Sequence, residues 1–242
     1  MSFAIVTPMA NESETFAEFT SRLTNVLDSF KGTKVQVFFV VDNVSKDNTL
    51  DLCHELSQTD TRYSTIFATE NKNVVDAYIR GYREALKYDF DYIIEMDAGL
   101  SHTPETIPMF IEKLQQGFDC VFGSRFIKGG DIKDSNWRRK LLSKGGTLLA
   151  NILLGTKMKD MTSGFMGFKA QTAKRFAEYQ LLSKAHFYQT EVRYLLRKHT
   201  YTEIPIIYCA PSPRVSFKAI ANSFSVLFHY FFGRITGKNT AL

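Results

Sequence analysis

The sequence contains few cysteines and no export leader. Three cysteines occur in 242 residues, at Cys53, Cys120 and Cys209, and none forms a C-x-x-C pair. An odd number of widely separated cysteines argues against a disulfide framework and a cysteine zinc site, and it favours a reducing compartment. No basic and apolar leader precedes the strand-like segment at residues 3–7. We therefore expect a cytoplasmic protein.

Phosphate-binding glycine loops are also absent. Neither G-x-G-x-x-G nor G-x-x-x-x-G-K-[ST] occurs, which excludes phosphate binding in the manner of dehydrogenases and P-loop enzymes. The net charge is only +5, from 30 Lys and Arg against 25 Asp and Glu. This mild excess suits anionic lipid or phosphate. Because no aromatic platform motif of an RNA-binding protein accompanies it, we expect no nucleic-acid partner.

Short apolar runs alternate with helical patterns in the first half of the chain. The runs are continuous and rich in β-branched and aromatic residues, which is typical of strands buried on both faces. Residues 16–30 and 74–85, which lie between such runs, place apolar side chains on one helical face. This order predicts an α/β fold with a doubly wound, mostly parallel central sheet flanked by helices. The predicted strands are residues 3–7, 35–41, 64–68, 92–96 and 119–122.

The second half has a different character. Residues 125–140 have the composition of a basic, glycine-containing loop, 141–154 of an amphipathic helix and 202–208 of a strand. No repeat or linker separates this half from the first. We therefore predict one catalytic domain over residues 1–215 and a C-terminal amphipathic tail at 216–242, packed on the same domain or on a membrane.

Acidic residues follow three of the predicted strands. Glu12 follows the first strand, Asp42 the second and Asp97 the fourth. Ligands of doubly wound sheets bind at the carboxyl ends of the strands. A single Asp there is more often a helix cap or a turn residue. Three at one edge favour a divalent cation that bridges carboxylates to a diphosphate.

Seven short motifs occur in a fixed order along most of the chain. The motifs are V-T-P-M-A-N-E-S-E (6–14), V-V-D-N-V-S-K-D-N-T (40–49), A-Y-I-R-G-Y-R-E-A-L (77–86), E-M-D-A-G-L-S-H-T-P-E-T-I-P (95–108), G-S-R-F-I-K-G-G (123–130), W-R-R-K-L-L-S-K-G-G (137–146) and D-M-T-S-G-F (160–165). Together they resemble the family 2 glycosyltransferases with the glycosyltransferase A fold, most of all the dolichol- or polyprenol-phosphate mannose synthase branch. The resemblance implies a nucleotide-diphosphate sugar as donor and a lipid-linked acceptor.

The resemblance assigns roles on the donor side. Pro8, Asn11 and Glu12 are expected to line the nucleotide-sugar pocket, and Asp42 is expected to hydrogen-bond the base. Asp97 would bind the donor as the first carboxylate of a metal site.

Two positions depart from the family pattern. The family usually has D-A-D where this chain has Asp97, Ala98 and Gly99, and D-D where it has Asp42 and Asn43. Mg²⁺ or Mn²⁺ can still be held by one carboxylate with diphosphate oxygens and water. Glu95 or His102 are candidates for a further metal contact. A reaction that needs no metal is the alternative.

The resemblance also assigns roles on the acceptor side. Arg125 is expected near the sugar or diphosphate, and Arg138, Arg139 and Ser143 near an acceptor phosphate. Glu191 lies in a Q-x-E element that borders the cleft in the family. The expected catalytic residues are Asp97, Arg125, Arg139 and Glu191.

The expected activity is inverting transfer of a sugar to a polyprenyl phosphate or another membrane-borne acceptor. A phosphate acceptor is already anionic and needs no general base. A hydroxyl acceptor, as in surface polysaccharide or glycolipid synthesis, needs one, for which Glu191 and Asp160 are the candidates. A catalytically weak protein that only binds nucleotide sugars is a third alternative, suggested by Gly99.

The C-terminal tail is the most apolar part of the sequence. Residues 217–232 carry a broad apolar helical stripe, but this run is shorter than the ~20 residues that span a bilayer. The stripe must cover the core, a partner or lipid, because its exposure to water is unfavourable. With Arg234 and Lys238 toward anionic head groups, the tail would hold the protein peripherally at the inner face of a membrane, directly or through a membrane protein. The residues of the stripe are Phe217, Ile220, Phe224, Leu227, Phe228, Phe231 and Phe232.

Overall fold

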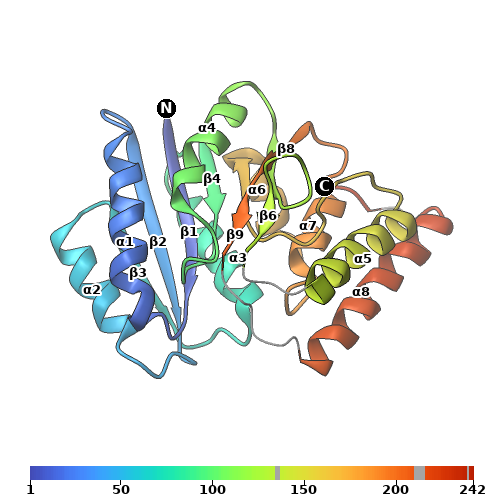
Figure 1. Ribbon diagram of the computed structural model, residues 1–242, viewed down its shortest axis with the longest axis horizontal. Coiled ribbons are helices and arrows are strands. Elements are labelled where there is room, and N and C mark those ends of the chain that lie inside the picture. The colour runs from blue at the N-terminus through green and yellow to red at the C-terminus, as the bar shows by residue number, and fades with distance from the viewer. Residues whose placement is uncertain (134–136, 210–215, 239) are drawn as a thin grey trace.

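A seven-stranded sheet runs through the centre of the computed structural model, which describes residues 1–133, 137–209, 216–238 and 240–242 (Figure 1). The strand order is β3-β2-β1-β4-β7-β5-β8, and every pairing is parallel except those of β7 with β4 and β5. The predicted α/β fold with a mostly parallel sheet is confirmed. The strands are β1 (Ser2–Met9), β2 (Lys34–Asp42), β3 (Tyr63–Ala68), β4 (Tyr92–Glu95), β5 (Cys120–Ser124), β7 (Met166–Lys169) and β8 (Tyr201–Pro205).

Helices cover both faces of this sheet. Because side chains alternate along a strand, β1 sends Phe3 and Ile5 into one core and Ala4 and Val6 into the other. The first core is closed by α1 (Ser13–Asp28), α2 (Thr49–Thr59) and α4 (Ile107–Gln115), which follows the 3₁₀ turn Pro104–Thr106. The second core is closed by α3 (Val74–Ala85), α5 (Trp137–Leu154), α6 (Ala170–Ala177), α7 (Tyr188–Leu195) and α8 (Phe217–Ile235).

Two expectations about the second half were wrong in their boundaries. The helix expected from residue 141 already begins at Trp137, inside the predicted loop. The strand expected over 202–208 is interrupted, because Pro205, which lacks an amide hydrogen, ends β8. The chain continues as β9 (Ile207–Tyr208), which pairs with β6 (Asp131–Ile132) in a separate two-stranded sheet.

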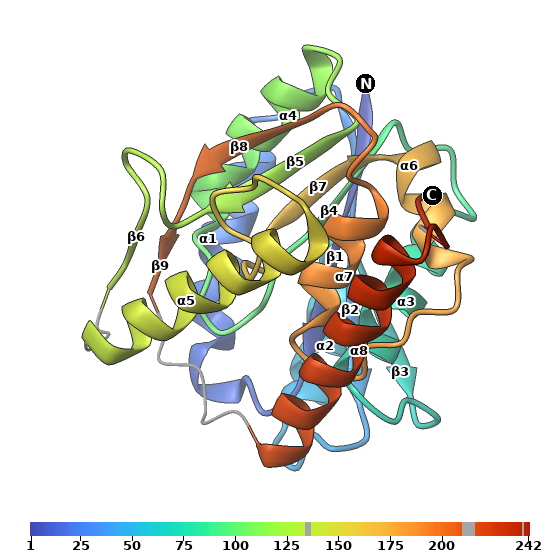
Figure 2. The ribbon, with the colours of Figure 1, turned by 90° about the vertical axis from the view of Figure 1, so that its right-hand side faces the viewer.

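Helices α5 and α8 lie side by side at the edge of the domain (Figures 1 and 2). The inner side of α8 belongs to the second core through Val226, Leu227 and Tyr230. The expected single stripe therefore divides, with Leu227 in the core and most of the other members facing outward. We call the exposed apolar side chains of both helices the α5–α8 surface: Trp137, Leu141, Leu142, Leu148, Leu149, Ile152, Phe217, Ile220, Phe224, Phe228, Phe232 and Ile235.

The two helices are also joined by a polar contact. Arg234 of α8 donates hydrogen bonds to the carbonyl oxygens of Ile152 and Leu153 at the end of α5, at 3.3 and 2.9 Å. Arg234 is therefore engaged at a helix C-terminus, where a cation is favoured. Within the described ranges, no helix has both the length and the hydropathy required to cross a bilayer.

Candidate active site

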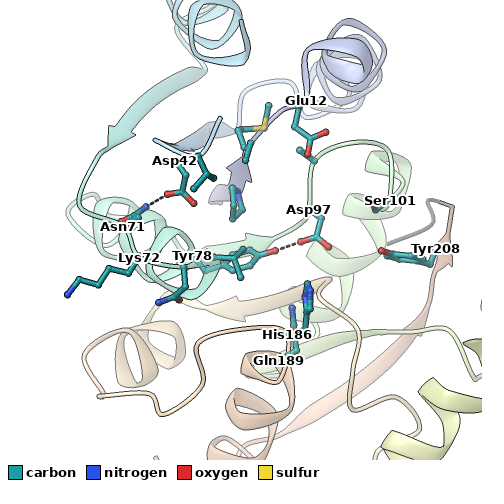
Figure 3. A pocket seen from close by; sticks show the side chains of 17 residues that line it. Glu12, Asp42, Asn71, Lys72, Tyr78, Asp97, Ser101, His186, Gln189 and Tyr208 are labelled. Carbon is teal, nitrogen blue, oxygen red and sulfur yellow. Dashed lines mark hydrogen bonds between the residues drawn. The ribbon is translucent and has the colours of Figure 1, made fainter. Parts of the chain in front are cut away.

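A pocket of about 380 Å³ opens at the carboxyl ends of β1, β2 and β4. This is the edge where the acidic residues were predicted to meet, and Glu12, Asp42 and Asp97 all line the pocket (Figure 3). Asp42 lies at one end of it, and Asp97 lies toward the other. The remaining lining residues are Pro8, Met9, Ala10, Val44, Asn71, Lys72, Asn73, Val74, Tyr78, Ala98, Ser101, His186, Gln189 and Tyr208.

Asp42 is held in place by the loop that follows β3. Asn71 Nδ2 donates a hydrogen bond to Asp42 Oδ1 at 2.6 Å, and Arg80 Nε in turn donates to Asn71 Oδ1 at 3.2 Å. Burial raises the pKa of Asp42, although the Asn71 hydrogen bond partly offsets this effect. The carboxylate is thus fixed at the mouth of the pocket, where it can accept hydrogen bonds from a ligand.

Asp97 is oriented by two neighbours. The Tyr78 hydroxyl donates a hydrogen bond to Asp97 Oδ1, and the Asp97 amide donates to His102 Nδ1 at 3.0 Å. Because His102 Nδ1 accepts this bond, the ring is neutral and carries its proton on Nε2. Burial lowers the pKa of His102, which agrees with that state. The Asp97 side chain itself is 36% exposed and faces the pocket.

Glu12 approaches the Asp97 loop from the first turn after β1. Thr15 Oγ1 donates to Glu12 Oε2 at 3.2 Å, and the Glu12 amide donates to Thr49 Oγ1 at 2.8 Å. Burial raises the pKa of Glu12, and the charge of Asp97 adds to this effect. The two carboxylates therefore share one region of the pocket.

Glu95 lies beneath the pocket and does not line it. Tyr82 and Tyr188 donate their hydroxyl groups to Glu95 Oε2 at 3.0 and 2.6 Å. The ring of Tyr188 stacks on that of Tyr78 with centroids 5.3 Å apart. Glu95 is fully buried, and burial raises its pKa to about 8. The expected metal contact from Glu95 has no support in this geometry, since its carboxyl group belongs to the core.

Glu95→Gln is expected to change how stability depends on pH. An unfolded Glu releases its proton near its ordinary pKa of 4.5, whereas folded Glu95 keeps it to about pH 8. The stabilisation is complete below pH 4.5 and is lost as pH rises to about 8. We expect the unfolding free energy of the wild type, measured in urea, to fall by on the order of 5 kcal/mol across this window because of Glu95. Glu12 and Asp42 also have raised pKa values, so some fall should remain in Glu95→Gln, but it should be clearly smaller than in the wild type. An equal fall in both proteins would contradict the assignment.

Asn11 was expected to line the pocket, but in the structure it supports the neighbouring loops. It connects the loops after β1 and β2 but does not line the pocket. Its amide donates to Ser45 Oγ at 3.0 Å, and its Oδ1 accepts from the Lys46 amide at 2.9 Å. Asn11 has φ 58°, in the left-handed region that asparagine tolerates better than most residues. The structure therefore places Asn11 as a support for the loops that carry Glu12 and Asp42.

Arg125 lies beside the pocket and is already paired. Its Nε and Nη2 donate to Asp160 Oδ2 and Oδ1 at 2.7 and 2.8 Å, and Asp160 is fully buried. The guanidinium carbon lies 5.8 Å from the ring centroid of Tyr208, which lines the pocket. Arg125 also lines a second cavity of about 240 Å³, together with Lys140 and Lys144. We call this second space the basic cavity.

The other acceptor-side predictions fall on α5 and α7. Arg138 and Arg139 are in the first turn of α5, and their side chains lie outside the described part of the structure. Ser143 is half-buried on the same helix and lines neither space. Glu191 is fully buried, and it accepts hydrogen bonds from the amides of Leu182 and Ser183 and from the Tyr230 hydroxyl. Its expected catalytic role therefore has no contact with the pocket to support it.

Several pocket residues were not identified as site residues from the sequence. Asn71 and Lys72 follow β3, and an inspection of polar as well as acidic residues after each strand would have found them. Tyr78 comes from the inward face of α3, where its apolar spacing indicated core packing. The same inspection would have found Ser101 in the loop after β4. His186 and Tyr208 carry no such signal, because tertiary structure alone brings them to the pocket.

Comparison with known proteins identifies the family. The family model "Glycosyl transferase family 2" matches residues 4–176. A dolichol-phosphate mannosyltransferase of Pyrococcus furiosus is 35% identical over 178 residues, covering 72% of this chain and 48% of the relative. An undecaprenyl-phosphate mannosyltransferase of Micrococcus luteus is 30% identical over 171 residues, covering 70% of each chain. This chain thus spans about half the length of the Pyrococcus protein.

The structure has relatives at low sequence identity. Glucosyl-3-phosphoglycerate synthase from Mycobacterium tuberculosis, in complex with Mn²⁺, UDP and phosphoglyceric acid, superposes with a TM-score of 0.65 at 13% identity, over 96% of this chain and 78% of that one. The same enzyme with Mg²⁺ and UDP gives 0.64 at 14% identity, over 98% and 79%. These structures support the glycosyltransferase A fold expected from the sequence. With the family match covering most of its length, the chain belongs to glycosyltransferase family 2.

Proposed function

We propose that this protein transfers a hexosyl group from a nucleotide-diphosphate sugar to a polyprenyl phosphate at a membrane surface. Mannose is the first candidate, because the relatives from Pyrococcus furiosus and Micrococcus luteus are both named as mannosyltransferases of polyprenyl-type phosphates. The α5–α8 surface is the observation that supports a membrane-borne acceptor. Its apolar side chains are exposed on a helix pair that packs against the helix carrying Gln189 of the pocket.

The donor would lie along the pocket. Asp42, held by Asn71, would accept hydrogen bonds from the base or ribose, and Pro8 would contact the nucleoside. The diphosphate would lie toward Asp97, whose exposed carboxylate suits a divalent cation such as Mg²⁺ or Mn²⁺. A cation bound there would neutralise the charge that develops on the departing diphosphate. The Tyr78 hydrogen bond would keep Asp97 oriented for that role.

The residues present fit such a cation. Asp97 offers one oxygen to Tyr78 and has the other available toward the pocket, where Glu12 also directs a carboxylate. Gln189 is 6% exposed, and its Oε1 accepts no hydrogen bond from any residue that the structure describes. A buried amide oxygen without a partner is costly unless a ligand satisfies it. Oxygen ligands of these kinds are the ones that Mg²⁺ and Mn²⁺ prefer.

A phosphate acceptor agrees with the state of the candidate bases. Asp160 is paired with Arg125, and Glu191 accepts three hydrogen bonds from the protein, so neither carboxylate is positioned to deprotonate a hydroxyl group. A phosphate needs no such base. The basic cavity beside Tyr208 offers Lys144 to it, whereas Lys140 is paired with Asp131 at 2.7 Å. We retain Arg138, Arg139 and Ser143 as proposed acceptor-phosphate residues on the same helix.

The α5–α8 surface would rest on the head-group region of the bilayer. Apolar helices with flanking cations bind there without spanning the membrane. Lys218 and Lys238 are exposed at the two ends of α8. In this arrangement the lipid tail of the acceptor stays in the bilayer, while its phosphate reaches the pocket. The free cysteines suit the cytoplasmic face.

A donor panel tests this function. GDP-mannose, UDP-glucose and UDP-galactose, each labelled in the sugar, would be incubated with the protein and vesicles that contain undecaprenyl phosphate and Mn²⁺. We expect label from at least one donor to enter the lipid fraction. Binding of nucleotides without transfer from any donor would favour the catalytically weak alternative. Transfer to a soluble hydroxyl acceptor, such as 3-phosphoglycerate, in preference to the lipid would contradict the proposed acceptor.

Asp42→Ala is expected to weaken binding of the donor more than it slows the reaction. Contacts to the base or ribose are the same in the ground state and the transition state, so their loss raises KM and leaves kcat nearly unchanged. We expect KM for the donor to rise about tenfold, the effect of losing one hydrogen bond to a charged group. The measurement is initial rates over a range of donor concentrations. An unchanged KM would remove Asp42 from the donor site.

A further inference from the structure

Gly99 and Glu12 meet where family members usually carry a second aspartate. A side chain at position 99 would place its Cβ 2.6 Å from Glu12 Oε2, well inside van der Waals contact. Gly99 has φ 69°, a conformation that disfavours most side chains. The Glu12 carboxylate therefore occupies the space into which a side chain at position 99 would extend.

The position of Glu12 needs a positive partner. It lies close enough to Asp97 for the two charges to repel each other, and no Lys or Arg among the described residues forms an ion pair with either carboxylate. Two carboxylates that share a partly desolvated region are unfavourable unless a cation lies between them. Thr15 supplies only one neutral hydrogen bond to Glu12.

The amide of Gln189 borders the same region from below. A Cβ on Gly164 would lie 3.2 Å from Gln189 Nε2 and 3.4 Å from Asp97 Oδ2, so the amide nitrogen and the carboxylate both adjoin Gly164. Gln189 and Asp97 both line the pocket (Figure 3). Gln189 is nine-tenths buried, and its Oε1 has no protein partner within the described ranges. This orphaned oxygen points to a ligand at the same place.

We infer that Glu12 supplies the second carboxylate of the metal site, in place of the aspartate that Gly99 replaces. The carboxylate comes from the loop after β1 instead of the loop after β4 and faces Asp97 across the region where the diphosphate would lie. The inference rests on the proposed donor site. It gives Glu12 a role in binding the cation instead of the nucleoside.

Calorimetry with GDP and UDP, each with and without Mn²⁺, separates these roles. For the wild type, we expect Mn²⁺ to lower the Kd of the preferred nucleotide about tenfold or more. For Glu12→Gln, we expect Mn²⁺ to lower it about twofold or less. Without metal, Glu12→Gln should bind the nucleotide as well as wild type or better, since a negative charge near the diphosphate is gone. Glu14→Gln, which removes an exposed charge two residues away, is the matched control and should behave as wild type.

A double variant that moves the carboxylate from position 12 to position 99 tests the inference by a gain of the Mn²⁺ effect, not only by its loss. Glu12→Ala removes the clash at position 99, and Gly99→Asp in the same chain returns a carboxylate to the usual position, where Asp tolerates a positive φ better than most residues. We expect this double variant to regain the Mn²⁺ effect that Glu12→Ala alone lacks.

Three results would overturn the inference, and they are distinguishable. Retention of the full Mn²⁺ effect by Glu12→Gln would exclude Glu12 as a ligand. Nucleotide binding by wild type with no Mn²⁺ effect would exclude the metal site and leave the donor pocket intact. Failure of wild type to bind either nucleotide would remove the proposed function and this inference with it. Thermal melting of each variant verifies that it is folded.

Discussion

Asp97→Asn is expected to lower the rate of sugar transfer by about 1,000-fold, the loss associated with removing a group that stabilises developing charge. The substitution keeps the shape of the side chain and an oxygen that can accept the Tyr78 hydrogen bond, but it removes the charge that would hold the cation. The fold should be unaffected, because Asp97 is partly exposed and forms no buried ion pair. The measurement is kcat with saturating donor, together with a thermal melting curve.

Asp89→Asn is the matched control for this experiment. Asp89 is exposed and precedes β4, whereas Asp97 follows it, so the two positions lie at opposite ends of the same strand. We expect the control to retain wild-type kcat. If Asp97→Asn also transferred sugar at the wild-type rate, the pocket would not be the catalytic site.

Phe224→Glu combined with Phe228→Glu is expected to weaken vesicle binding by about 100-fold. Each Phe contributes ~1.5–3 kcal/mol when fully buried; these two are 47% and 43% exposed in the protein alone, so only part of that is available to lipid. Placing two charges in the interface adds a further cost. The lost burial of the two Phe side chains and the cost of the two charges together reach roughly 2.7 kcal/mol, which corresponds to a 100-fold change in the affinity for vesicles. Sedimentation with vesicles of anionic and neutral lipid measures the effect, and transfer to a membrane-borne acceptor should fall in parallel.

Phe67→Glu controls for the loss of an exposed aromatic residue. Phe67 is 47% exposed on β3, the opposite edge strand of the sheet from the α5–α8 side. We expect the control to sediment as wild type does, and all variants to bind nucleotide equally. Unchanged vesicle binding by the double variant would contradict a membrane role for the surface. A change from a larger species to a monomer on size exclusion would instead indicate that a second copy covers it.

The sequence predicted the sheet because its physical signals are local. Continuous β-branched runs predicted β1 and β2 to within two residues of their observed bounds. Strands buried on both faces are apolar along their whole length, so the run of apolar residues itself marks where the strand begins and ends. The three acidic residues chosen by their position after a strand, Glu12, Asp42 and Asp97, do line one pocket. This success follows from parallel pairing, which brings the carboxyl ends of neighbouring strands to one edge.

The remaining features depend on contacts between distant segments. β7 is four residues long and pairs antiparallel between β4 and β5, an insertion that no local pattern in M-G-F-K indicates. The division of the α8 stripe depends on where the helix is docked, which spacing alone does not specify. The motif resemblance indicated Arg125 and Glu191 as functional, but not that each would be buried in a hydrogen-bond network of its own.

The most direct test of the account compares two acceptors that differ only in their phosphate. Undecaprenyl phosphate and undecaprenol would be placed in identical vesicles, and transfer of labelled sugar from the preferred donor would be measured with wild-type protein. The account predicts transfer to the phosphate and none above background to the alcohol, because the two candidate bases, Asp160 and Glu191, are already engaged by hydrogen bonds within the protein. Equal or faster transfer to the alcohol would contradict it.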